Sequence, residues 1–392
     1  MREVKKAPPA KRVKKPNILL RILTLGTTAA LVLGALALVV YRDAFDLAAL
    51  KRWMAYRSMP TSESGESAPF THAGGDKLSI AYLDSGAVTA SAAGAHYYGL
   101  DGRALAEEVL SMESPVLSAS RTTAVAYDAG GQALFSFRDG EERFSLSLEG
   151  GADLLSARPN GGGWLAVTAQ QSGYKGAVTV YNSHGKEIIQ ISLSSVFAVD
   201  AALSPDGRTV SVVTMGQENG SFFSRLLFFP VTQEEPSAQV DLGSINVLDM
   251  DYEDGLLWVL CEDRLLTVTP DGETVQTYHI SPSYLKGCSL EGDGFALLLT
   301  GRYRSGGATQ ALIIGKDGQV LQSLPLSNQV LDYAADGKYF GLLSGSRLLL
   351  YDLNLEVYAT LDNSQGARRL DLSPNGSALL ANDQKAWLYI PQ

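Results

Sequence analysis

The chain has 392 residues, of which 45% are hydrophobic, and a net charge of −10. It is long enough for one large domain or two average ones, and its 39 glycines suit many short strands joined by tight turns. Residues 1–69 hold 12 Lys and Arg against 5 Asp and Glu, so residues 70–392 hold the other 20 and 37, a net charge of −17. Such an acidic domain repels phosphate backbones, which argues against nucleic-acid binding.

The N-terminal region predicts a membrane anchor. Residues 1–16 are basic and contain three prolines, which predicts a disordered cytoplasmic tail. Residues 17–41 predict a single transmembrane helix through which the protein contacts the lipid bilayer, because residues 22–41 carry no charge over 20 positions. The higher density of Lys and Arg before this segment places the N-terminus in the cytoplasm and the rest of the chain outside. We expect an uncleaved signal anchor, with a cleaved signal peptide as the alternative.

An amphipathic helix is expected next, over residues 42–59. Phe45, Ala49, Trp53 and Tyr56 recur at helical spacing, and Trp and Tyr beside Lys and Arg suit the headgroup layer of a membrane. The helix is either a continuation of the transmembrane helix or an interfacial or dimerisation helix. Residues 60–75 are mostly small and polar and predict a flexible linker.

Residues 76–392 contain a repeat of roughly 35–48 residues, a period typical of propellers and solenoids. One marker is a pair of strands joined by an Asp-Gly type of turn, as in LFSFRDGEERFSLSL from Leu134. A second marker has a turn such as Ser-Pro-Asp-Gly followed by an apolar strand, as in DAALSPDGRTVSVVT from Asp200. The markers alternate, so each unit has four strands, a to d, with one marker at the a–b turn and the other at the c–d turn.

This pattern predicts an all-β fold, an eight-bladed β-propeller preceded by the transmembrane helix, with seven blades as the alternative. Seven c–d turns are present, and residues 368–390 supply a further a-b-c set that lacks its d strand. Residues 77–92 either provide that strand or form a and b of the first blade. We expect the chain ends to pair, because an unpaired edge strand promotes aggregation.

The Ser-Pro-Asp-Gly turns resemble those of bacterial propellers of the WD-repeat-like, quinoprotein-like and translocation-associated kinds. The whole layout of anchor and propeller resembles an uncharacterised family of membrane-anchored bacterial β-propellers, a domain-of-unknown-function family. The resemblance implies the fold and leaves the function open, because its motifs are structural turns.

Catalytic and cofactor motifs are absent from the sequence. The four histidines are not spaced as metal ligands, and the chain contains neither a Gly-x-Ser-x-Gly elbow nor a Walker loop. Only four Trp occur, too few for the recurrent docking motif of a quinoprotein dehydrogenase. We therefore expect a protein that is not an enzyme and has no cofactor and no metal. Cys261 and Cys288 fall on adjacent blades, either as a disulfide or as two free thiols.

The longest insertions fall on one face of the predicted propeller. Strands alternate in direction within a blade, so the b–c and d–a loops share the face opposite the a–b and c–d turns. Three b–c loops carry aromatic and basic residues, the types enriched at binding hot spots. These candidate partner-binding residues are Tyr174, Lys175, Phe222, Phe223, Arg302, Tyr303 and Arg304. The loops are either a partner-binding rim or variable segments with no role in binding.

These features favour a membrane-anchored, extracytoplasmic propeller that binds or scaffolds a protein partner at the cell envelope. The alternatives are a propeller that binds a small molecule or cofactor, such as a degenerate quinoprotein, and an envelope sensor that signals to the cytoplasmic tail. The identity of the partner or ligand and the oligomeric state do not follow from these patterns.

Overall fold

The computed structural model describes residues 26–28, 32, 47–72, 74 and 77–391. The chain divides into two units, Met1–Lys51 and Arg52–Gln392. The predicted tail and most of the predicted transmembrane segment, residues 17–41, lie outside the described residues; 26–28 and 32 are helical. Within the described part of the chain, no helix is long and apolar enough to cross a membrane. One helix, α2 (Leu47–Tyr56), runs across the boundary between the units.

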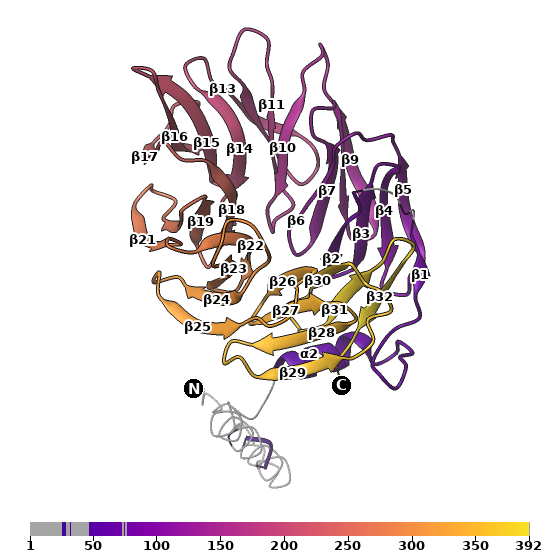
Figure 1. Cartoon of the computed structure of the whole chain (residues 1–392). Helices are drawn as coiled ribbons and strands as arrows, with labels where there is room; N and C mark the ends of the chain where they lie inside the picture. Colours follow the sequence, from indigo (N-terminus) through magenta and orange to yellow (C-terminus); the bar gives the residue numbers. More distant parts are fainter. Residues whose placement is uncertain (1–25, 29–31, 33–46, 73, 75–76, 392) are drawn as a thin grey trace, which may run out of the picture. The chain divides into compact units, whose positions relative to one another are not determined.

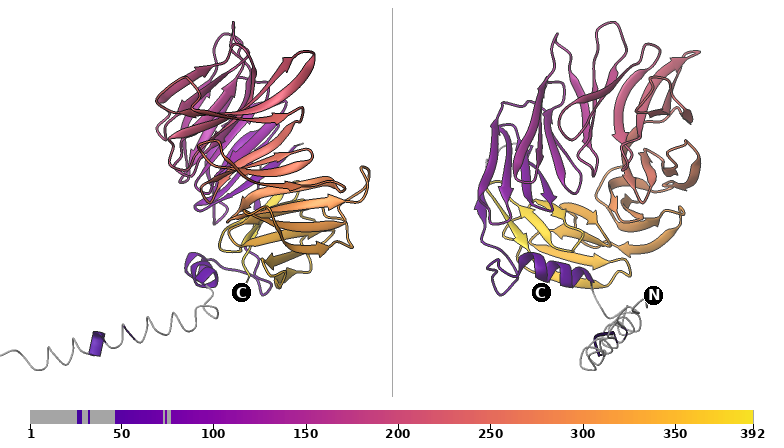
Figure 2. Two further views of the ribbon diagram at one scale, coloured as in Figure 1. Left: turned by 90° about the vertical axis from the view of Figure 1, so that its left-hand side faces the viewer. Right: turned by 180° about the vertical axis from the view of Figure 1, so that it is seen from behind.

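The second unit is an eight-bladed β-propeller, as predicted, and the seven-bladed alternative is wrong (Figure 1). Each blade is a four-stranded antiparallel sheet, and the blades follow one another around a ring that Figure 2 shows from the side and from behind. Blade 1 consists of β2 (Ser79–Leu83), β3 (Gly86–Ser91), β4 (Gly94–Gly99) and β5 (Ala104–Val109). Blade 2 consists of β6 (Pro115–Ala119), β7 (Thr123–Asp128), β8 (Ala133–Arg138) and β9 (Glu141–Ser147). Blade 3 consists of β10 (Leu154–Pro159), β11 (Leu165–Ala169), β12 (Ala177–Tyr181) and β13 (Glu187–Ser192). Blade 4 consists of β14 (Phe197–Leu203), β15 (Thr209–Glu218), β16 (Ser221–Pro230) and β17 (Ala238–Gly243).

The remaining blades repeat this order. Blade 5 consists of β18 (Val247–Glu253), β19 (Leu256–Cys261), β20 (Arg264–Val268) and β21 (Thr274–His279). Blade 6 consists of β22 (Tyr284–Gly292), β23 (Phe295–Gly301), β24 (Gln310–Gly315) and β25 (Val320–Pro325). Blade 7 consists of β26 (Asp332–Asp336), β27 (Tyr339–Ser344), β28 (Arg347–Asp352) and β29 (Val357–Leu361). Blade 8 consists of β30 (Arg369–Leu372), β31 (Ala378–Ala381), β32 (Lys385–Tyr389) and β1 (Phe70–Thr71).

The turn chemistry explains the regular spacing of the strands. In the a–b turn of blade 4, the Ser204 hydroxyl donates to Asp206 Oδ1 (2.6 Å) and accepts from the Thr209 N–H (3.0 Å). Gly207 adopts φ +67°, a left-handed conformation that favours glycine. Each Ser-Pro-Asp-Gly or Asp-Gly sequence therefore reverses the chain within a few residues and starts the next strand.

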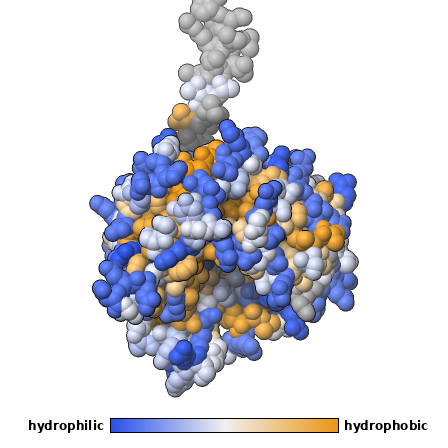
Figure 3. All heavy atoms as spheres, turned by 90° about the horizontal axis from the view of Figure 1, so that it is seen from above, coloured by the Kyte–Doolittle hydropathy of each residue, from blue (hydrophilic) through white to orange (hydrophobic). Residues whose placement is uncertain are grey.

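The core lies between the blades. In the described part of the chain, buried apolar side chains form eight clusters, one at each seam between neighbouring blades, with Phe137, Phe228 and Phe340 among the fully buried residues. The second strand of each blade, such as β7, is almost entirely buried, whereas outer strands such as β9 alternate between exposed and partly buried residues. The edge of the ring is correspondingly mixed, with hydrophobic residues among hydrophilic ones (Figure 3).

The N-terminal end of the propeller supplies the missing d strand. In β1, Phe70 pairs with Ala386 and Thr71 with Lys385 of β32, and residues 77–92 form the first two strands of blade 1. The preceding segment is also attached: the Ser67 N–H donates to the Leu388 carbonyl, and the Ile390 N–H donates to the Gly65 carbonyl (both 2.8 Å). The segment predicted as a flexible linker, residues 60–75, therefore includes the closing strand of the ring.

The end of α2 belongs to the same closing seam, between blades 8 and 1. Tyr56 is buried with Leu78, Tyr82 and Leu388, and Arg52 is also buried. Trp53 is 61% exposed whereas Tyr56 is buried, so these two residues of the predicted stripe have different surroundings. The buried pair is instead Arg52 and Tyr56, which are four residues apart and share a helix face.

The two cysteines are free, which contradicts the disulfide alternative. Cys261 packs in the seam between blades 4 and 5, and Cys288 packs in the seam between blades 5 and 6. The sheet of blade 5 therefore separates the two thiols. Burial raises the pKa of Cys261 to about 12, so this thiol stays protonated at neutral pH.

Candidate functional site

The predicted binding residues lie on the b–c hairpins of blades 3, 4 and 6. Tyr174 and Lys175 lie between β11 and β12, and residues 302–304 lie between β23 and β24. Phe222 and Phe223 belong to β16 rather than to a loop. The reason is that β15 and β16 pair as far as Glu218 and Ser221, with the turn made by residues 219 and 220 at positive φ.

The structure brings the residues of blades 3 and 4 into neighbouring hairpins and leaves those of blade 6 apart. Lys175 lies over the ring of Phe197 (5.1 Å), the first residue of β14, which is itself exposed and was missed by the sequence reasoning. Blade 5 has only two residues between its b and c strands, so it separates this group from Arg302, Tyr303 and Arg304. The prediction of one continuous rim is replaced by two patches.

Contacts fix several of these side chains. Lys175 Nζ donates to the Ser195 carbonyl (2.9 Å), and the guanidinium of Arg225 lies 4.0 Å from the centre of the Phe223 ring. The Arg304 carbonyl accepts a hydrogen bond from Lys286 Nζ (2.8 Å), which holds the loop of blade 6. Tyr303 at the tip of that loop is 73% exposed. The face therefore presents aromatic rings on anchored hairpins.

A second candidate site is the central channel, which the sequence reasoning missed. The innermost strands of all eight blades enclose a cavity of about 890 Å³. Its lining contains two arginines, Arg121 and Arg158, and no lysine or histidine. The carboxylates of the lining are Asp200, Asp249, Asp251, Glu253, Asp254, Glu291, Asp293, Asp332, Asp336 and Asp371. The strong excess of acidic groups gives the channel a negative potential.

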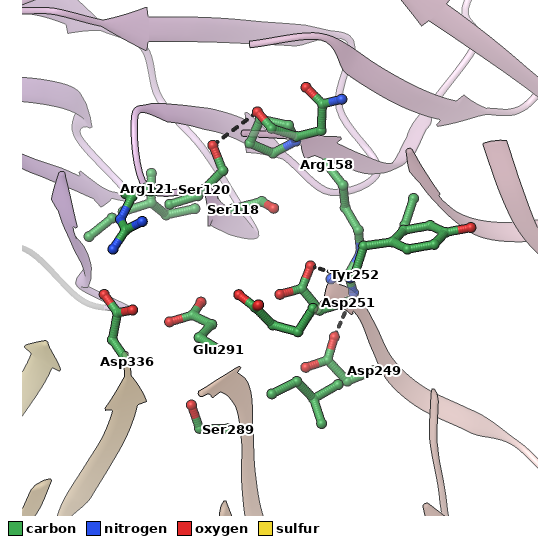
Figure 4. A pocket seen from close by; sticks show the side chains of 18 of the residues that line it. Ser118, Ser120, Arg121, Arg158, Asp249, Asp251, Tyr252, Ser289, Glu291 and Asp336 are labelled. Carbon is green, nitrogen blue, oxygen red and sulfur yellow. Dashed lines mark hydrogen bonds and ion pairs between the residues drawn. The ribbon is translucent and has the colours of Figure 1, made fainter. Parts of the chain in front are cut away.

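On one side of the channel Arg158 neutralises part of this charge. From β10 in blade 3 its guanidinium binds Asp200 Oδ2 of blade 4 (2.8 Å) and Asp249 Oδ1 of blade 5 (2.8 Å). It also donates to the Met250 carbonyl (2.9 Å), and Figure 4 shows it reaching across the channel lining. One side chain thus joins the inner strands of three consecutive blades.

Two further carboxylates join neighbouring blades through backbone groups. Asp332 of blade 7 accepts from the Leu370 N–H of blade 8 (2.9 Å). Asp371 of blade 8 accepts from the Tyr82 N–H of blade 1 (2.7 Å). These contacts give Asp332 and Asp371 structural roles at the seams beside the closing strand.

Of the other channel carboxylates, Asp254 pairs with Lys316 of blade 6 (2.6 Å), whereas three others lack such a contact. Among the described residues, Glu253, Glu291 and Asp336 form no ion pair, and Figure 4 shows Glu291 and Asp336 pointing into the channel. Removal from bulk water, followed by the charge of Asp371, raises the pKa of Asp336 to about 8. Burial, followed by the charges of Asp251 and Asp293, raises the pKa of Glu253 to about 7. Both carboxyl groups are therefore partly protonated near neutral pH.

The channel chemistry is not that of a preformed metal centre or an anionic cofactor site. In the part of the chain that the structure describes, no group of three or more His, Cys, Asp or Glu side chains is arranged to hold a metal ion. A quinone cofactor that carries carboxylates would meet carboxylates on most sides of the channel. The arrangement therefore does not fit the degenerate-quinoprotein alternative.

Residues 61–356 match a family of unknown function, DUF5711. The chain belongs to the DUF5711 family. No protein with a curated description matches the sequence.

Solved structures resemble this DUF5711 chain in fold. BamB from Moraxella catarrhalis superposes with a TM-score of 0.52 at 14% identity, over 82% of this chain and 98% of BamB. The C-terminal WD40 domain of Sif2 gives 0.56 at 13% identity, over 79% and 93% of the two chains. The designed protein Ika8 gives 0.56 at 13% identity, over 85% and 98%. At these identities the likeness shows the propeller fold alone. The resemblance to a propeller family of unknown function is therefore confirmed. The membrane anchor of that family stays a prediction for this chain.

Proposed function

We propose that this DUF5711 protein is a membrane-anchored, extracytoplasmic and non-enzymatic module that binds a protein partner at the cell envelope through the b–c face of its propeller. The observation that carries the proposal is the set of exposed aromatic side chains on anchored hairpins of that face. Tyr303, Tyr174 and Phe222 are 73%, 49% and 40% exposed. Rigidly held aromatic and arginine side chains contribute much of the affinity at protein interfaces, because little side-chain entropy is lost when they bind.

The charge distribution supports the choice of face. The loop of blade 6 carries Arg302 and Arg304, and the neighbouring β22 carries Lys286, in a domain whose net charge is −17 over residues 70–392. The face that carries the a–b turns instead surrounds an acidic channel. A partner that presents acidic and apolar side chains would fit the b–c face and would be repelled by the opposite one.

The test is crosslinking of the full-length protein in cells, followed by purification and mass spectrometry. The variant Arg302→Ser/Tyr303→Ser/Arg304→Ser removes the blade 6 patch. The matched control His184→Ser/Lys186→Ser changes exposed residues in the c–d turn of blade 3, on the opposite face. We expect a crosslinked envelope protein that the patch variant loses and the control retains. A partner retained by the patch variant, or lost from both, would contradict binding at this patch.

The same samples test the alternatives of a small-molecule propeller and a sensor. A ligand held in the channel would raise the melting temperature of the wild-type protein and of the patch variant alike. A sensor would lose its output when residues 1–16 are deleted, with its partner still bound. If no partner is crosslinked, a ligand-dependent rise in melting temperature would replace the proposed function by small-molecule binding. Loss of output on deletion of residues 1–16 would replace it by a sensor function.

A further inference from the structure

The end of α2 has two different faces. Arg52 and Tyr56 are buried against the propeller, whereas Trp53 and Met54 are 61% and 53% exposed. At about 100° per residue, Trp53, Met54 and Arg57 span about 100° of the helix circumference, with Trp53 about 60° and Met54 about 160° from Tyr56. Large apolar side chains gathered on an exposed helix face indicate a contact surface.

Hydrogen bonds prevent this face from turning inward. Arg52 Nη1 donates to the Asn375 carbonyl in the a–b turn of blade 8 (2.7 Å). The Tyr56 hydroxyl is hydrogen-bonded to the hydroxyls of Tyr82 and Ser377. Rotation of the helix would break these buried contacts and expose Arg52 and Tyr56 instead. Trp53 is therefore held on the outside.

The predicted anchor limits what this face can meet. Ten residues, 42–51, connect the apolar segment 22–41 to Arg52. Fully extended they reach at most about 35 Å, and as a helix about 15 Å, so Trp53 stays close to a bilayer that holds the segment. Trp beside cations such as Lys51 and Arg57 is typical of the layer between lipid tails and water.

We propose that the Trp53–Met54–Arg57 face of α2 lies in the headgroup layer of the bilayer and so holds the a–b turns of the closing seam toward the membrane. This inference rests on the proposed membrane anchor. The a–b face also carries the mouth of the acidic channel, which anionic lipids repel. The contact between α2 and the bilayer consequently depends on the apolar side chains Trp53 and Met54. It therefore does not require anionic lipid and forms on zwitterionic lipid. The b–c face with Tyr303 points away from the membrane.

The test uses the full-length protein in phosphatidylcholine vesicles with either ordinary or brominated acyl chains. Subtracting the fluorescence of Trp53→Phe isolates Trp53, because the other three tryptophans, Trp164, Trp258 and Trp387, are present in both proteins. We expect the Trp53 emission to shift to the blue and to be quenched by brominated lipid. The control, Trp53→Phe/Tyr303→Trp, places the reporter on the b–c face, where iodide quenches it and brominated lipid does not.

The outcomes separate the inference from the anchor on which it rests. Flotation of the vesicles reports the anchor independently of Trp53. If the protein floats with the vesicles but brominated lipid does not quench Trp53, the inference is overturned and the anchor is retained. This holds both when iodide quenches Trp53, which then faces water, and when a second copy of the chain covers it. Equal quenching of Trp53 and of the control reporter on the b–c face would also overturn it. Failure to float would overturn both proposals.

Discussion

The two sides of the central channel use the same residue types with opposite consequences. On the clasped side, defined by Arg158, Asp200 and Asp249, each carboxylate lies 2.8 Å from a guanidinium nitrogen. On the open side, defined by Glu253, Glu291 and Asp336, no ion pair forms among the described residues, and the carboxyl pKa values are raised. The carboxylates paired with Arg158 join neighbouring blades on the clasped side. The carboxylates without an ion pair repel each other on the open side. The effect of a channel carboxylate on stability therefore depends on its neighbours rather than on burial alone.

The largest expected effect follows from removing the clasp. Arg158→Met leaves Asp200 and Asp249 without their cation and should lower the free energy of unfolding by roughly 2–4 kcal/mol, at the lower end of breaking a buried pair because the groups are partly exposed. Chemical denaturation of the full-length protein measures the change. The control Arg347→Met, whose exposed side chain pairs with Asp362 (2.6 Å) outside the channel, should cost less than about 0.5 kcal/mol. Equal losses in the two variants would show that the clasp contributes nothing special.

A smaller loss is expected at Asp332, which joins blades 7 and 8. Asp332→Ala leaves the Leu370 N–H without its acceptor and should cost about 1–2 kcal/mol at pH 5. Asp332→Asn keeps an acceptor oxygen in place and serves as the control. A thermal melt in which the Ala and Asn variants coincide would exclude a role for this hydrogen bond.

The open side should respond in the opposite direction. Asp336 has a pKa of about 8 in the fold and an ordinary value of 3.8, so between these values the unfolded chain binds fewer protons and stability falls as the pH rises. Asp336→Asn should therefore stabilise the protein by about 1 kcal/mol at pH 8, after allowance for solvent screening, and by less at pH 5. Denaturation at both pH values tests the prediction. A variant less stable than wild type at pH 8 would contradict repulsion on this side.

The smallest effect is expected outside the channel. Changing Arg302, Tyr303 and Arg304 to Ser should alter the free energy of unfolding by less than about 0.5 kcal/mol, because their side chains are exposed. Denaturation beside the wild type checks this. A larger loss would mean that the patch supports the fold, and crosslinking losses at that patch would then need another explanation.

The fold was largely predictable because each turn is encoded locally. Ser204, Asp206 and Gly207 define a chain reversal within a few residues, and repetition of such turns predicted the blades. The closing strand was not predictable, since Phe70 and Thr71 are too short a segment to show periodicity. Their partner strand lies at the other end of the chain. The prediction that the chain ends pair is confirmed, but with residues assigned to the linker.

The channel left a signal in the sequence that was not used. An acidic residue precedes the a–b turn in five copies of the marker: Asp200, Asp249, Glu291, Asp332 and Asp371. Strand periodicity indicates which side chains are buried, but it does not show that inner strands far apart in sequence converge on one axis. The clasp of Arg158 across three blades depends on that convergence, so local patterns could not reveal it.

The pairing of β1 with β32 has a consequence for the timing of folding. The two strands are separated by most of the residues of the propeller, so the ring cannot close until β32 has been synthesised. Until then β1 has no partner strand. Ring closure is thus a late step with high contact order. A chain interrupted before β32 would carry all the earlier turns and still leave β1 without a partner and open to aggregation.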